Sequence, residues 1–248
     1  STTQIKGLSA TQLKALTTTD IGELADTQIA ALTADQLKNL SATNLSALSA
    51  TQVAGLGASQ IAALTNTQLQ GLSVTDIDEL SSTQVGALTK IQVGVLTETQ
   101  AQELSTTQLA GMSASQIGGL TASAFVALNS TQVRSLSATQ IGGLSATQLK
   151  TLDTSEVYEF STQVGLLSAS QLGALTTTAL NSMDQTQVQS IGTTQLRGMN
   201  ATQIKGLDQF LHFIDDTQIS SLTTSQMQAL SATQINAAGP TVWHALAT

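Results

Sequence analysis

Apolar residues recur along this chain with a period of eight. The segment from Leu136 to Leu152 reads LSATQIGGLSATQLKTL and shows the complete unit. A marker leucine is followed by Ser or Thr, by Gln three residues later and then by Ile, Leu or Val. The marker position runs in phase from Leu8 to Leu152, with Met112 as its one substitution over that stretch. So regular a pattern indicates a repeat architecture.

Neither a strand nor one long helix accommodates this period. A half-buried strand needs apolar residues at even offsets, but the second apolar position follows each marker by five residues, as Leu13 follows Leu8. In a continuous α-helix eight residues turn through about 800°, so the apolar stripe would drift by roughly 80° with each repeat. The octad therefore favours a shorter element that restarts in every unit.

A helix-start signal fits every position of the octad. If Ser137 is an N-cap, Gln140 is the third helical residue, and the two form a capping box. Leu136 and Ile141 then occupy the two positions of a hydrophobic staple. We therefore predict one helix of one to two turns in each octad.

The substitutions at these two polar positions keep their chemistry. Asp or Glu replaces Gln at Asp20, Asp76 and Glu156, where a carboxylate suits a helix N-terminus. Other good N-cap residues replace Ser or Thr at Asn129, Asp153, Asp184, Asn200, Asp208 and Asp215. We predict that all of them cap helices.

Short helices of this kind are marginal alone, but identical units joined by identical turns generate a superhelix. The predicted fold is thus all-α, a solenoid of short helices with Leu and Ile along its axis. Small residues before the marker, such as Gly142 and Gly143, are expected to let neighbouring turns approach closely. The alternative is a β-solenoid in which Thr and Gln side chains stack in ladders.

The repeat is expected to occupy residues 1–238, with 239–248 as a C-terminal tail or cap. Seven-residue units interrupt it at 161–167 and 208–214. Aromatic residues gather at these interruptions and in the tail, so they are the candidate assembly contacts: Tyr158, Phe160, Phe210, Phe213 and Trp243. The simpler interpretation is that they fill the packing gap left by a shortened unit.

Composition narrows the function classes. The net charge is −8, from 16 acidic and 8 basic residues, which argues against binding to nucleic acid or an anionic membrane. There is no cysteine, so no disulfide framework or thiolate metal site is expected. No apolar run approaches the roughly 20 residues of a membrane span.

Candidate chemistry is sparse. The two histidines, His212 and His244, lie in atypical segments without converging ligands or a nucleophile. The scattered acidic residues do not follow a calcium-loop pattern. We therefore expect no enzyme activity, no catalytic or metal-binding residues and no cofactor.

The L-[ST]-x-T-Q-[ILV]-x-x array resembles octapeptide-repeat tracts of large secreted or surface-attached bacterial proteins described as adhesin-like or haem-utilisation-like. The resemblance implies an extracellular or cell-surface location and a structural or adhesive role. The expected function is a non-enzymatic filament or layer subunit that binds copies of itself head to tail, or a rigid adhesin stalk. The alternative is a binding module whose Ser/Thr/Gln face meets a glycan, mineral or ice, with the cell envelope as a further partner.

Overall fold

The predicted all-α fold is confirmed in a computed structural model, which describes residues 1–237. Short helices follow one another throughout the described residues, and none of these residues forms a strand, so the β-solenoid alternative is wrong. The chain divides into two compact units. Unit 1 is Ser1–Leu128, and unit 2 begins at Asn129.

The helices of each unit are four to six residues long. Unit 1 contains α1 (Thr2–Lys6), α2 (Ala10–Ala15), α3 (Thr18–Glu23), α4 (Asp26–Ala30), α5 (Ala34–Leu37), α6 (Ala42–Ser46), α7 (Ala50–Ala54), α8 (Ala58–Ile61), α9 (Asn66–Gln70), α10 (Val74–Glu79), α11 (Ser82–Gly86), α12 (Lys90–Val93), α13 (Glu98–Gln102), α14 (Thr106–Ala110), α15 (Ala114–Ile117) and α16 (Ala122–Val126). Unit 2 contains α17 (Ser130–Ser135), α18 (Ala138–Gly142), α19 (Ala146–Thr151), α20 (Thr154–Glu159), the 3-10 helix η1 (Ser161–Leu166), α21 (Ala169–Leu172), α22 (Thr177–Asn181), α23 (Gln185–Ser190), α24 (Thr193–Leu196), α25 (Ala201–Gly206), α26 (Gln209–Phe213), α27 (Asp216–Ser220), α28 (Thr224–Ala229) and α29 (Ala232–Ala237).

Most helices begin where the capping box predicts. At α18 the backbone N–H of Gln140 donates to the Ser137 hydroxyl at 3.3 Å, and the Ser137 N–H donates to Gln140 Oε1 at 2.9 Å. Ser137 itself has extended φ and ψ of −70° and 161°. The same pair of bonds occurs in most octads of both units, but Asp208 makes no side-chain cap bond, so its predicted capping role is wrong.

Each helix also ends after little more than one turn. The marker leucine donates its N–H to the carbonyl three residues earlier, as Leu144 does to Ile141 at 3.1 Å, which tightens the last turn. The next Ser or Thr is extended again and starts a new helix. The end of one helix and the start of the next are thus set by adjacent residues, and this arrangement repeats with each octad.

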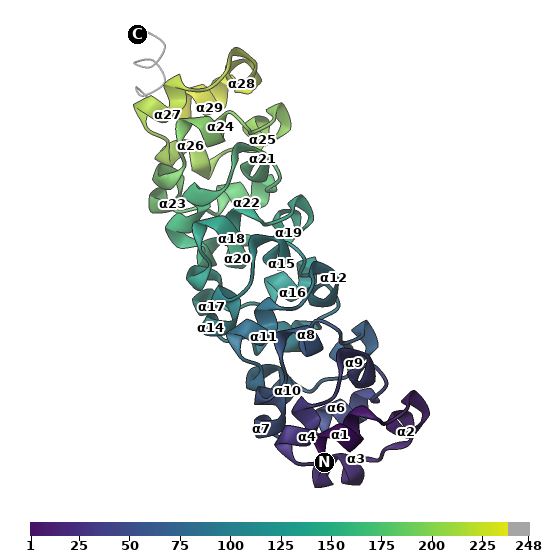
Figure 1. Cartoon of the computed structure of the whole chain (residues 1–248). Coiled ribbons are helices and arrows are strands. Elements are labelled where there is room, and N and C mark those ends of the chain that lie inside the picture. The colour runs from purple at the N-terminus through teal and green to yellow at the C-terminus, as the bar shows by residue number, and fades with distance from the viewer. Residues whose placement is uncertain (238–248) are drawn as a thin grey trace. The chain divides into compact units, whose positions relative to one another are not determined.

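Successive helices wind into a superhelix within each unit (Figure 1). In unit 1 most helices pack against the third one after them, as α11 does with α14 and α13 with α16. Unit 2 repeats this spacing, as in α21 with α24 and α25 with α28. A solenoid in which neighbouring turns make the tertiary contacts is the result.

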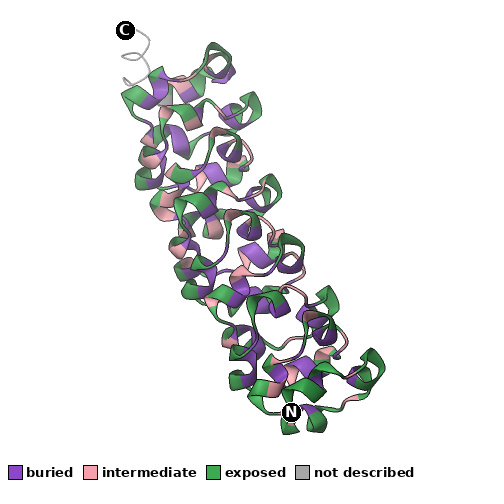
Figure 2. Cartoon of the chain, in the orientation of Figure 1, coloured by how far each residue is buried: buried purple, intermediate pink, exposed green. Residues whose placement is uncertain are grey.

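The core of each unit consists of the two apolar positions of the octad, which lie on the inner side of the helices (Figure 2). Ile141 and Leu149 are fully buried, and Leu136 and Leu144 nearly so. Burying each such side chain contributes about 1.5–3 kcal/mol, which is what makes these short helices stable.

The two seven-residue units differ in backbone. At 161–167 the helix is η1 instead of an α-helix, and Ser161 has a φ of 49°, the single positive φ among the described non-glycine residues. That left-handed conformation lets the chain turn without the missing residue. At 208–214 the chain still forms α26, although Asp208 gives it no side-chain cap.

The predicted close approach of small residues holds at some positions and fails at others. A Cβ built on Gly198 would overlap the Ala169 carbonyl group of the preceding turn. A Cβ built on Gly142 would meet nothing within 4 Å, so the close packing predicted there is wrong. Gly142 is exposed on the outer side of α18, where nothing requires a small residue.

Candidate functional site

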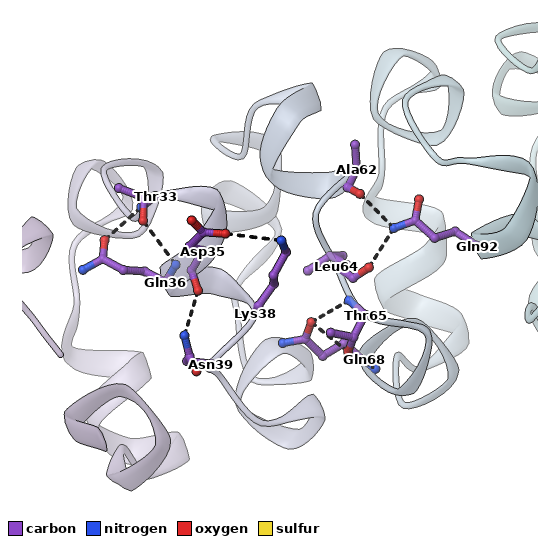
Figure 3. A network of polar contacts seen from close by, with 10 residues as sticks. All are labelled: Thr33, Asp35, Gln36, Lys38, Asn39, Ala62, Leu64, Thr65, Gln68 and Gln92. Carbon is purple, nitrogen blue, oxygen red and sulfur yellow. Dashed lines mark hydrogen bonds and ion pairs between the residues drawn. The ribbon is translucent and has the colours of Figure 1, made fainter. Parts of the chain in front are cut away.

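In most octads after the first turn, the glutamine forms hydrogen bonds in two directions. Gln68 Oε1 accepts the Thr65 N–H of its own helix start at 2.8 Å. Its Nε2 donates to the carbonyls of Leu37 and Leu40 in the preceding turn, at 2.9 and 2.8 Å. Gln92 donates in the same way to Ala62 and Leu64 (Figure 3). We call this series of bonds between turns the glutamine ladder.

The glutamine ladder supplies hydrogen-bond donors to the backbone carbonyls at the ends of the short helices. Every short helix leaves carbonyls without intrahelical partners, and burying them unpaired costs free energy. An amide can accept at the cap and donate across the turn at once, whereas a carboxylate can only accept. Glutamines that donate across turns are, in unit 1, Gln36, Gln52, Gln60, Gln68, Gln84, Gln92, Gln100, Gln108 and Gln116. In unit 2 they include Gln163, Gln171, Gln187, Gln195, Gln203, Gln218, Gln226 and Gln234.

Sequence reasoning missed this second role. The capping box accounts for Gln and Glu equally well, so the cap alone does not explain why Gln is so strongly preferred. The preference for Gln over Glu was the feature of the sequence that could have indicated a second hydrogen bond. The acceptors lie 28 and 31 residues upstream, as for Gln68, and only the superhelix brings them within reach.

The interruptions leave the ladder in register. Gln203 donates to carbonyls 31 and 28 residues upstream. For Gln171 and Gln218 a seven-residue unit lies between donor and acceptor, and the acceptors are 30 and 27 residues upstream. The same structural positions are therefore paired. At η1 itself Gln163 keeps its bond to Leu136 at 2.8 Å, while its buried Oε1 has no hydrogen-bond partner within the described chain.

Several units have no amide side chain at the ladder position, among them those of Asp76, Ala124 and Ala179. At Asp76 the carboxylate accepts from the Ser73 N–H at 2.6 Å and from the Ser46 hydroxyl of the preceding turn, so the direction of that bond is reversed. A small cavity of about 20 Å³ adjoins Asp76 and is otherwise lined by apolar residues. Alanine occupies the position at Ala124 in unit 1 and Ala179 in unit 2.

The first turn of unit 1 has a different surface from the later turns. Gln4 and Gln12 are exposed and Gln28 is half-buried, and their Nε2 groups donate to no acceptor in the described chain. The marker leucines of this turn are also only partly buried: Leu8, Leu16 and Leu24. We call these six residues the first-turn face. It combines unused amide donors with partly exposed leucines.

The structure separates the candidate aromatic residues. Phe160 and Phe210 are 1% and 0% exposed, so they belong to the core and are not available to a neighbouring chain. Tyr158 is 61% exposed, and Phe213 is half-buried. Trp243 lies outside the described residues. An assembly role therefore remains a prediction for Tyr158, Phe213 and Trp243.

Some acidic groups have shifted pKa values with identifiable causes. Burial, with the nearby charges of Asp76 and Asp78, raises the pKa of Glu79, whose buried Oε2 has no hydrogen-bond partner in the described chain. At the cap of α20 the pKa of Glu156 is raised by burial and by its hydrogen bond with Asp153, whose own pKa is lowered.

These groups do not converge on one centre. The described residues contain no cluster of three His, Asp or Glu side chains that could hold a metal ion. His212 is exposed on α26, and His244 lies outside the described part of the chain. None of the helices described has the length and apolar character needed to cross a membrane.

A comparison with known protein families supports the repeat character of the chain. The family model described as ALTTAQ repeat matches residues 29–66, a stretch within unit 1 that runs from the end of α4 to the start of α9. It contains three ladder glutamines, Gln36, Gln52 and Gln60. A search of curated proteins finds no match to the chain.

Proposed function

We propose that this is a non-enzymatic structural repeat protein whose solenoid stacks end to end on further copies of the same repeat, at the bacterial cell surface. The first-turn face carries the proposal. The amide groups of Gln4, Gln12 and Gln28 have no acceptor in the described chain, although the equivalent groups from Gln36 onward donate to a preceding turn.

The geometry of the ladder defines what fits this face. The complementary surface is a solenoid turn that presents helix carbonyls at the same spacing, together with apolar positions that cover Leu8, Leu16 and Leu24. Another turn of this repeat has that surface. It can belong to a second copy of the chain or to further repeats of a longer array.

Contact of this kind is heterologous, because one end of a solenoid meets the opposite end of the next. Heterologous contacts that do not close into a ring produce filaments. Stacking between copies therefore favours a filament or layer subunit, and stacking within a longer array favours a stalk. The bacterial cell-surface setting rests on the resemblance of the octad to repeats of adhesin-like proteins.

The non-enzymatic part of the proposal rests on how the hydroxyl groups are used. The Ser and Thr residues at helix starts accept hydrogen bonds from the third helical N–H, as Ser113 does from Gln116 at 3.3 Å. Among the described residues, no hydrogen bond joins His212 of α26 to a Ser or Thr hydroxyl that it could activate as a nucleophile.

Negative-stain electron microscopy and light scattering after size exclusion test the proposal. We expect concentration-dependent filaments or end-to-end oligomers. The variant with Gln4→Glu, Gln12→Glu and Gln28→Glu keeps an acceptor oxygen for each cap but removes the donors, so its association should weaken at least tenfold. The control carries the same charge change at three exposed glutamines outside the ladder: Gln70→Glu, Gln185→Glu and Gln189→Glu.

Strictly monomeric wild-type particles at high concentration would contradict filament assembly by this chain. Equal association of the two triple variants would show that the first-turn face is not the contact. Tyr158→Ser provides a further comparison, because loss of assembly in that variant alone would place the contact at the interruption.

A further inference from the structure

The broken ladder position at Ala124 leaves a carbonyl without its partner. In the neighbouring octads the marker carbonyl accepts from the glutamine 28 residues later, as Leu64 does from Gln92 and Leu88 from Gln116. The residue 28 positions after Leu96 is Ala124, which has no side-chain donor. No described residue donates a hydrogen bond to the Leu96 carbonyl.

A groove of about 530 Å³ lies at this position on unit 1. It runs between the turn that precedes α13 and the start of α16, with the end of α9 beside it. Its lining includes Leu96, Thr97, Glu98, Thr99, Thr121 and Ser123. Its volume is within the range of about 300–1,000 Å³ that is typical of small-molecule sites.

Hydroxyl pairs line the two sides of the groove. Thr97 Oγ1 lies 3.1 Å from Thr99 Oγ1, and Thr121 Oγ1 lies 3.3 Å from Ser123 Oγ. All four side chains are exposed, and so is the carboxylate of Glu98. Hydroxyls donate and accept, and a carboxylate accepts, so this lining matches a ligand rich in hydroxyl groups.

We propose that this groove binds an N-acetylated amino sugar. The amide N–H of its acetamido group replaces the missing glutamine amide as a donor to the Leu96 carbonyl. The ring hydroxyls bond with Glu98, Thr99 and Ser123. The lining residues include no aromatic side chain for stacking, so the expected dissociation constant is roughly millimolar, equivalent to about −4 kcal/mol.

Titration of the ¹⁵N-labelled full chain by NMR tests this site, with N-acetylglucosamine and glucose as the two probes. N-acetylglucosamine should produce saturable shifts confined to residues around Leu96, Thr99 and Ser123, and glucose should bind at least fivefold more weakly. Absence of saturable shifts would overturn the proposal. Equal affinity for the two sugars would overturn the role of the acetamido group.

Two sets of variants locate the binding. Ala124→Gln restores the ladder amide and should abolish the shifts, whereas Ala179→Gln, the same change at the broken position in unit 2, should leave them unchanged. Because Ala124 is fully buried and the larger side chain could disturb folding, the double variant Thr99→Ala with Ser123→Ala provides an independent test at exposed positions.

The double variant should weaken N-acetylglucosamine binding at least fivefold. Its control is Thr107→Ala, an exposed change at the same helical position in α14, away from the groove. Unchanged affinity in the double variant, or an equal loss in the Thr107→Ala control, would overturn the assignment of the site to this groove.

Discussion

Glutamine at the third helical position determines how the turns of this solenoid are joined. One amide accepts at its own helix start and donates to the carbonyls that end a helix of the preceding turn, and it is buried while doing so. Gln84, which is 4% exposed, donates to Val53 and Leu56 at 2.7 and 2.9 Å. Buried polar groups of this kind are costly to leave unpaired, which gives a single residue a large effect on stability.

The first prediction concerns this double role. Gln84→Glu keeps an oxygen that accepts from the Ser81 N–H. It removes the donor to the carbonyls of Val53 and Leu56 and places a carboxylate beside them. Leaving buried acceptors unpaired costs about 1–3 kcal/mol each, so we expect a loss of about 3 kcal/mol in the free energy of unfolding. Urea unfolding followed by circular dichroism at 222 nm measures it.

The matched control is Gln12→Glu, at the same helical position with the same capping box but without bonds to a preceding turn. A surface change of this kind should alter the free energy of unfolding by less than about 0.5 kcal/mol. Equal losses in the two variants would show that the cap, and not the ladder, is what the glutamine contributes.

The second prediction concerns Glu79, at the end of α10. Burial and the charges of Asp76 and Asp78 raise its pKa above the ordinary value of 4.5. A raised pKa in the folded state means that folding favours the protonated carboxyl relative to the unfolded chain. This contribution to stability is therefore complete below pH 4.5 and is lost as the pH rises through the folded-state pKa.

Glu79→Gln should therefore raise the thermal unfolding midpoint at pH 7, with a difference that disappears at about pH 4. Glu103→Gln, an exposed carboxylate after α13, controls for the general reduction of negative charge. A midpoint at pH 7 that is unchanged or lowered in the Glu79 variant would contradict this account.

At the scale of the element, each helix is too short to be stable by itself. Isolated helices below about 12–15 residues are marginal in water, and these contain four to six. Capping stabilises each start by about 1 kcal/mol, and the apolar pair of the octad supplies the rest through packing on neighbouring turns. How closely those turns approach therefore matters at specific residues.

The third prediction compares two glycines. Gly198→Ala places a Cβ against the Ala169 carbonyl of the preceding turn, and overpacking of this kind costs about 1–3 kcal/mol. Gly142→Ala meets nothing within 4 Å, and alanine is the better helix former by about 0.5–1 kcal/mol. Urea midpoints should therefore move in opposite directions. A destabilised Gly142→Ala variant would show that turns approach at that position after all.

At the scale of the whole molecule, stability rests on apolar burial and neutral hydrogen bonds. Charged residues make up 10% of the chain. Among the described residues there is a single ion pair, Lys38 with Asp35 at 3.3 Å, and Asp35 is 93% exposed in it. Exposed pairs contribute little, and salt screens what they contribute.

The fourth prediction follows from this charge distribution. Between 0.05 and 0.5 M sodium chloride, the free energy of unfolding should change by less than about 1 kcal/mol, because the ladder and the core are insensitive to screening. The small change should be an increase, since the net charge of −8 repels itself at low salt. A large loss of stability in salt would point to ion pairs that carry the fold.

Local rules were readable from the sequence because their partners lie close along the chain. The octad predicted a helix start at Ser137, the pairing of Ser137 with Gln140 and the burial of Leu136 and Ile141, and each is present. Asp208 shows where a good N-cap residue does not suffice, because its φ of −130° and ψ of −79° place its side chain out of the capping geometry.

The candidate site depends on burial and on contacts between different turns, which could not be predicted from the sequence. The aromatic residues at the interruptions were recognisable as a group, but burial divides them: Phe160 and Phe210 fill the core, and Tyr158 faces solvent. Likewise, nothing in the sequence around Ala124 indicates that a hydrogen bond to another turn is missing there. Its importance appears only beside Leu96 of the preceding turn.

The sequence by itself thus determined the repeat, the helix in each octad and the apolar positions, because each capping box and staple involves residues within five positions of one another. The tertiary structure alone decided what meets across turns: the acceptors of the glutamine ladder, the groove beside Ala124, the open space around Gly142 and the unused donors of the first-turn face. Those contacts join residues about 28 positions apart, at a separation fixed by the rise and rotation of every helix between them.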